Sequence, residues 1–146
     1  MLRYLIVSIF GGLLFGVMDA VINNNSLALK LFQVYQPIAK TSVNSLAGIS
    51  IDIFFGLVMA GLFIQLHKKL PGQSGFVKGL SFGLMAWFFR VVMQTASSWM
   101  MFNIPGDTLI YGLLTGLVEM AVIGIFLGLT LKPKAIAVYK GRSQVF

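Results

Sequence analysis

Apolar residues run along the chain in four long segments that are separated by polar connections. The segments cover about residues 2–22, 44–66, 76–102 and 108–131. About 20 apolar helical residues span the roughly 30 Å hydrocarbon core of a bilayer, and each segment reaches that length. Barrel strands are about half as long and alternate in polarity, and lipid leaves no partner for unpaired backbone groups. The pattern therefore predicts an all-α integral membrane protein, a four-transmembrane-helix bundle forming a single membrane domain.

The longest connection, residues 23–43, joins the first two segments. Leu27, Leu31, Val34 and Tyr35 are spaced as one face of a helix that would end before Pro37. This spacing is typical of an amphipathic helix lying at the membrane surface, and an irregular loop is the alternative. The first segment is too long for a signal peptide and has no small-residue cleavage site after it, so we expect a retained helix.

The charges are few and unevenly placed. Hydrophobic residues make up 58% of the 146-residue chain and charged residues 10%, against about 25% in a typical soluble domain. Of the 11 Lys and Arg residues, eight lie on the side of both termini and two on the side of the 23–43 connection. Because cytoplasmic loops carry the excess of Lys and Arg, we expect both termini in the cytoplasm and the 23–43 connection outside. The short chain and this charge split favour a prokaryotic inner membrane.

The formal net charge of +7 also bears on possible partners. The basic tail, residues 132–146, is expected to contact anionic lipid head groups on the cytoplasmic side. A nucleic-acid partner is not expected, since the pattern leaves no soluble domain to bind one.

Each predicted span carries a row of small residues at helical spacing. Helices associate in lipid by close backbone approach at such residues and by polar contacts, not by burying leucine. Ten glycines lie on these rows and are predicted to pack helices together: Gly12, Gly16, Gly48, Gly56, Gly79, Gly83, Gly112, Gly116, Gly124 and Gly128. The opposite faces are rich in Leu, Ile, Val and Phe, as expected for lipid-facing surfaces.

Each row also holds one ionisable residue: Asp19, Asp52, Arg90 or Glu119. A charge at the bilayer centre costs about 2.5–3.5 kcal/mol on insertion scales. Arg90 precedes Pro105 by nearly the same number of positions as Glu119 follows it. In an antiparallel hairpin these two meet at one depth, so Glu119 is the first candidate partner for Arg90.

The other polar residues on these rows complete a predicted intramembrane cluster. Gln94 follows Arg90 by one turn, and Asp19 lies near the outer end of its span. One arginine then faces two deep carboxyl groups. Asp52 is therefore a candidate proton site, or a contact for a cationic group on a ligand or partner subunit.

An internal repeat is suggested by two short stretches. GLLFGVM at residues 12–18 and GLSFGLM at 79–85 agree at five of seven positions, and the same offset also relates Asp52 to Glu119. We interpret this as a tandem repeat of two helical hairpins, related by an axis along the membrane normal. Chance similarity between glycine-rich helices is the alternative.

The sequence gives little support for a catalytic, metal-binding or nucleotide-binding site. The chain has no cysteine and one histidine, His67, so thiolate sites and histidine-assisted nucleophiles are not expected. The eight methionines suit core packing better than copper binding. No phosphate-binding or dinucleotide motif is present. We therefore expect neither an enzyme nor a bound metal or cofactor.

Two functions fit the pattern. The first is an accessory or scaffolding subunit that associates through its small-residue faces in a homo-oligomer or a larger membrane complex. The second is a small proton- or ion-coupled transporter or channel that uses Asp52, Arg90 and Glu119, since intramembrane ionisable residues are functional candidates by default.

Overall fold

The computed structural model describes residues 2–42 and 44–131, and within these ranges every regular element is a helix. The spans are α1 (Leu2–Asn23), α3 (Ser45–Leu66), a third made of α4 (Gly75–Trp87), η2 (Phe88–Val92) and α5 (Met93–Met101), and α6 (Gly106–Thr130). All four are long and apolar enough to cross a membrane, which indicates an integral membrane protein. The predicted basic tail lies outside the described residues.

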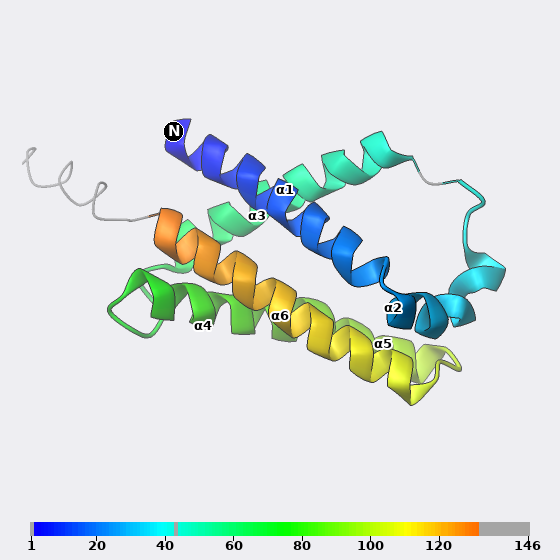
Figure 1. Ribbon diagram of the computed structural model, residues 1–146. Coiled ribbons are helices and arrows are strands. Elements are labelled where there is room, and N and C mark those ends of the chain that lie inside the picture. The colour runs from blue at the N-terminus through cyan, green and yellow to red at the C-terminus, as the bar shows by residue number, and fades with distance from the viewer. Residues whose placement is uncertain (1, 43, 132–146) are drawn as a thin grey trace, which may run out of the picture.

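The four spans form two antiparallel pairs, α1 with α3 and α4 with α6 (Figure 1). Contacts between α1 and α6 join the pairs. Figure 1 shows α1 and α3 crossing, whereas α6 runs alongside α4 and α5. We call the end that holds the N-terminus and the α3–α4 turn the terminal end, and the opposite end the loop end.

Close approach at glycines holds each pair together. A Cβ atom at Gly124 would lie 2.8 Å from the Cα of Gly83, and one at Gly56 would lie 2.8 Å from the Cα of Gly12. Real side chains do not come this close to backbone, so only glycine permits these contacts. Eight of the ten predicted packing glycines lie against another span. Six of them face its backbone (Gly12, Gly56, Gly79, Gly83, Gly124 and Gly128), and Gly16 and Gly116 face the side chains of Asp52 and Val91.

The other two predicted glycines pack against no span of the described chain. A Cβ at Gly48 or Gly112 would have nothing within 4 Å among the described residues. Gly48 lies on the first turns of α3, which stand away from the other spans beyond the crossing with α1 (Figure 1). Gly112 borders an open cleft between α5 and α6.

The two pairs meet in different registers. Gly12 lies against Ile53, so the offset that relates the two similar stretches would place Gly79 against Met120. Gly79 instead lies against Ile125, more than one helical turn further along α6. The duplication stays a prediction, but the α1–α3 pair and the α4–α6 pair do not pack in the same register.

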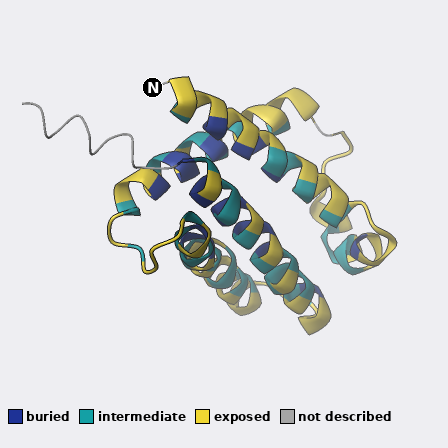
Figure 2. Cartoon of the chain, turned by 60° about the vertical axis from the view of Figure 1, so that its left-hand side comes forward, coloured by how far each residue is buried: buried dark blue, intermediate teal, exposed yellow. Residues whose placement is uncertain are grey.

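The hydrophobic core occupies the terminal half of the bundle. Its fully buried large side chains include Phe63, Phe82, Met120, Ile123 and Leu127. In the loop half, α5 has no buried residue, and Ala28 is the one buried hydrophobic residue in the described part of the outer connection. Figure 2 shows this imbalance, with buried positions mostly on the inward faces nearer the N-terminus.

The long connection is helical but divided in two. Asn25 caps α2 (Ser26–Leu31) by accepting the N–H groups of Leu27 and Ala28, as capping asparagines do. A 3₁₀ helix, η1 (Phe32–Ile38), follows and runs one residue past Pro37, where the predicted helix would have ended. The buried residue is Ala28, whereas Leu27, on the predicted apolar face, is 54% exposed.

A polar cleft that ends at Arg90 and Glu119

The third span changes its winding around Arg90. Phe88–Val92 form a π-helix, in which the Met93 N–H donates to the carbonyl of Phe88, five residues earlier. Such turns interrupt α-helices rarely and are frequent at functional sites. Just before this turn, the Trp87 indole Nε1 donates to the Leu113 carbonyl at 2.9 Å, which fixes the turn against α6.

The π-helix brings the Arg90 guanidinium to both helix pairs. Its carbon lies 4.5 Å from the centre of the Phe15 ring on α1 and 4.6 Å from that of Phe55 on α3. The two ring centres are themselves 4.5 Å apart. A cation over an aromatic face is stabilised by the ring quadrupole, more so away from water. Arg90 therefore links the α4–α6 pair to the α1–α3 pair.

The structure also brings Arg90 to Glu119, as the sequence predicts. Arg90 Nη1 lies 3.8 Å from Glu119 Oε2, and it also lies 3.9 Å from the sulfur of Met120. The separation from the carboxylate is an ionic contact but too long for a hydrogen bond. Arg90 thus spreads its interactions over two rings, a carboxylate and a thioether, and does not form a bidentate pair.

Glu119 is left with one unpaired oxygen. Its side chain is 9% exposed, and Oε1 is buried without a hydrogen-bond partner in the part of the chain that the structure describes. Buried polar atoms in proteins are nearly always hydrogen-bonded, so an exception calls for an explanation. The carboxyl group of Glu119 is thus held by Arg90 through Oε2, while Oε1 accepts no hydrogen bond from the described residues.

An open cleft of about 240 Å³ leads from the loop end to this pair. α1, η1, the third span and α6 form its walls. Its lining is mostly polar and includes Asp19, Asn23, Tyr35, Arg90, Gln94, Thr95, Ser98, Thr108, Thr115 and Glu119. Phe63, Phe82 and Leu127 belong to the packed core of the terminal half, where the cleft does not continue. Among the described residues, this cleft therefore opens toward the loop end and not toward the terminal end.

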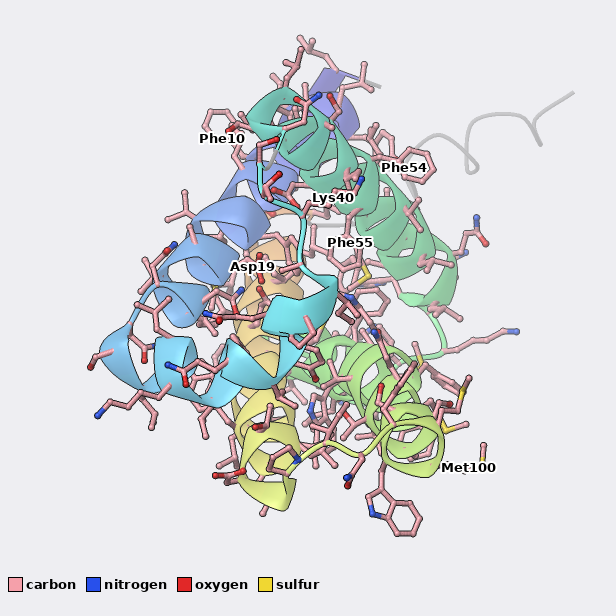
Figure 3. All side chains as sticks on the ribbon, turned by 90° about the vertical axis from the view of Figure 1, so that its right-hand side faces the viewer. Phe10, Asp19, Lys40, Phe54, Phe55 and Met100 are labelled. Atoms are coloured by element: carbon pink, nitrogen blue, oxygen red, sulfur yellow. The ribbon has the colours of Figure 1, made fainter. Side chains whose placement is uncertain are left out.

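The remaining predicted cluster residues divide between the cleft and its surroundings. Asp19 and Gln94 line the cleft, and Asp19 accepts a hydrogen bond of 2.8 Å from Asn23. Asp52 does not line it; its carboxyl group lies against Gly16 at the crossing of α1 and α3. In Figure 3, Asp19 and Phe55 lie toward the middle of the bundle, whereas Phe10, Phe54 and Met100 point outward.

No family model matches the chain, and no curated protein or solved structure is detectably similar to it. The function therefore has to be inferred from the geometry of the cleft and its charges.

Several site residues do not stand out in the sequence. Phe15 and Phe55 read as ordinary lipid-facing or core residues, and nothing marks them as partners of an arginine. The hydroxyl groups had a weak signal, because α5 contains the polar run Gln94 to Ser98 within an otherwise apolar span. Among the described residues, no group of three or more acidic or histidine side chains converges.

The half-open cleft makes a prediction that cysteine labelling can check, because the chain has no cysteine of its own. Ser98→Cys is expected to react with a charged maleimide in membrane sheets, since Ser98 lines the cleft and water supports thiolate formation. Ile123→Cys is expected to react only after denaturation, because Ile123 is 1% exposed in the packed half. Equal labelling rates at the two positions would contradict a cleft closed at the terminal end.

Proposed function

We propose that the protein is a small proton- or ion-coupled membrane transporter or channel whose solute site is the cleft above Arg90 and Glu119. The observation that carries this proposal is a polar cleft that reaches an ionisable pair near mid-span and stops at an apolar layer. A scaffold would need no such cleft, and each intramembrane charge is costly unless it is used. A transporter is expected to have a resting state in which the entrance is open on one side and packed side chains close the path beyond it.

The proposal also assigns the cleft to one side of the membrane. Lys68, Lys69 and Lys78 lie at the terminal end and Lys30 and Lys40 at the loop end. With the positive-inside rule, the cleft opens to the outside of the cell, in a prokaryotic inner membrane to the periplasm. Passage to the cytoplasm would require the two helix pairs to move apart at the terminal end.

In this scheme the residues have separate roles. Glu119 is the carboxyl group that would exchange a proton or contact a solute. Arg90 holds that carboxyl group in place and, through Phe15 and Phe55, couples it to the other helix pair. Asp19 lies nearer the loop end of the cleft than Glu119 does, and its negative charge attracts cations into the cleft. Asp52, at the α1–α3 crossing, lies where a relative movement of those helices would change its surroundings.

Flux through reconstituted vesicles tests this function. The purified chain in liposomes that contain a pH-sensitive dye is expected to dissipate an imposed pH gradient faster than empty liposomes. Glu119→Gln keeps the shape of the side chain and removes its charge, and it is expected to lower the rate at least tenfold. Thr130→Val, on the same helix but outside the cleft, is the matched control. A Glu119→Gln rate equal to that of the wild type would contradict the proposed role.

An accessory role is the second candidate, and one observation favours it. The first turns of α3 stand away from the other spans, and Gly48 there has no described neighbour within 4 Å. A small residue on a free helix face suits contact with a second copy or a companion subunit. Purification in mild detergent distinguishes the two: a companion protein in stoichiometric amount supports the accessory role, and a lone oligomer with flux supports transport.

A further inference from the structure

We propose that the cleft takes a small ammonium-type cation, meaning a singly charged group that carries several N–H donors. This inference rests on the proposed transport function and names its substrate class. It follows from three features: the charges of the cleft, its hydrogen-bonding groups, and the unpaired oxygen of Glu119, a residue that lines it.

The charges favour a cation. The charged groups that line the cleft are Asp19, Glu119 and Arg90, with Asp52 behind them on α3. The positive charge of Arg90 already faces Glu119 and two aromatic rings. The lining therefore keeps an excess of negative charge, which a single positive charge would balance.

The hydrogen-bonding groups favour a donor. Thr115 donates its hydroxyl proton to the Tyr111 carbonyl at 2.8 Å, and Thr108 donates its own to the Leu31 carbonyl at 3.1 Å. A hydroxyl oxygen whose proton is committed offers only its lone pairs. The side-chain oxygens of these two residues are therefore acceptors toward the cleft. These two groups suit an N–H group and offer no donor to a carboxylate or a carbonyl.

The floor of the cleft supplies the most specific observation. Glu119 Oε1 is an acceptor in a side chain that is 9% exposed, and no group within the described ranges donates to it. It belongs to a residue that lines the cleft. Oε1 itself is closed to solvent, so the Glu119 carboxyl group must rotate to present it to the cleft. An ammonium N–H would then satisfy this oxygen and bring a compensating charge, which a neutral solute would not do.

The cleft has room for a small solute. About 240 Å³ corresponds to roughly eight water molecules at 30 Å³ each. Methylammonium or ethanolamine fits this space with water to spare. Tetramethylammonium carries the same charge but has no N–H group. A comparison of the two cations therefore separates the effect of charge from that of hydrogen bonding.

Thermal unfolding of the purified full chain in detergent, at constant ionic strength, tests the assignment. Methylammonium chloride is expected to raise the melting temperature by several degrees, because a ligand that binds only the folded state stabilises it. Sodium, potassium and tetramethylammonium chlorides are expected to give little shift, and sodium formate none. Glu119→Gln is expected to abolish the methylammonium shift.

A pair of threonine variants keeps the test decisive if Glu119→Gln folds poorly. Thr115→Val removes an acceptor from the cleft wall and is expected to weaken methylammonium binding about tenfold, near the 1.4 kcal/mol that corresponds to such a change. Thr130→Val removes an equivalent hydroxyl, which donates to the Phe126 carbonyl outside the cleft, and is expected to leave binding unchanged.

The outcomes separate this inference from the proposed function. A shift of equal size with sodium or potassium would assign the site to metal cations, and a shift with formate would assign it to anions held by Arg90; either result overturns the ammonium assignment. Methylammonium binding without any vesicle flux would support the inference and refute transport. Proton flux without methylammonium binding would refute the inference alone.

Discussion

Replacing Arg90 with methionine is expected to lower the free energy of unfolding by about 2 kcal/mol and to abolish flux. The substitution leaves Glu119 buried with neither its cation nor a hydrogen bond to Oε1. Breaking a fully buried ion pair costs about 3–5 kcal/mol. We expect less because the Arg90 side chain is 41% exposed at the cleft, where water screens part of the interaction.

Two further variants separate charge from geometry. Arg90→Lys keeps the charge but loses the planar group that lies over Phe15 and Phe55, so it is expected to recover only part of the lost stability. The double variant Arg90→Met with Glu119→Met removes both partners and is expected to be more stable than Arg90→Met alone. Unfolding by a denaturing detergent, followed by circular dichroism, measures all three. A single Arg90→Met variant as stable as the wild type would contradict the role of the pair.

Replacing Gly124 with valine is expected to have the largest effect on folding, a loss of more than about 3 kcal/mol or failure to fold. Overpacking a tight core commonly costs about 1–3 kcal/mol when side chains can adjust. Here a Cβ would meet backbone, 2.8 Å from both the N and the Cα of Gly83. Backbone in a packed helix cannot move aside as a side-chain tip can, so α4 and α6 must separate.

Gly112→Val is the matched control for this variant. It makes the same substitution on the same helix, but a Cβ at Gly112 would have nothing within 4 Å among the described residues. Since valine is a slightly better helix former than glycine, this variant is expected to be neutral or slightly stabilising. Melting temperatures of the two variants in the same detergent give the comparison. Equal destabilisation would show that helix packing at glycine does not hold the α4–α6 pair.

The spans and the central ion pair follow from the sequence because they depend on short-range rules. Span lengths reflect the bilayer thickness, and composition is enough to find them. Arg90 and Glu119 are nearly equidistant from the turn at Pro105, so the geometry of an antiparallel hairpin alone places them at one level. Most of the glycines at helix crossings are likewise predicted, because small residues in rows have few other uses in lipid. Gly75, which lies against Gly128, is not among them.

The remaining features depend on how the pairs cross, which no local pattern encodes. Gly48 shares a row with Gly56 but lies about 12 Å away along α3, beyond the short stretch over which crossing helices touch. The π-helix could not be predicted, because its sequence, FFRVV, contains no proline or glycine. The contact of Arg90 with Phe15 and Phe55 requires the two pairs to be docked, and each aromatic residue alone is an unremarkable membrane residue.

The divergence of α3 from its neighbours has a consequence for the surrounding lipid. One half of the molecule is tightly packed, and the other spreads around its first α3 turns (Figures 1 and 2). Acyl chains must fill the wedge that this leaves, so the protein presents a wider perimeter to one leaflet than to the other. Any movement that draws α3 inward changes the area occupied in that leaflet alone. A conformational change of this kind would be coupled to lateral pressure, and lipids with small or large head groups should shift it in opposite directions.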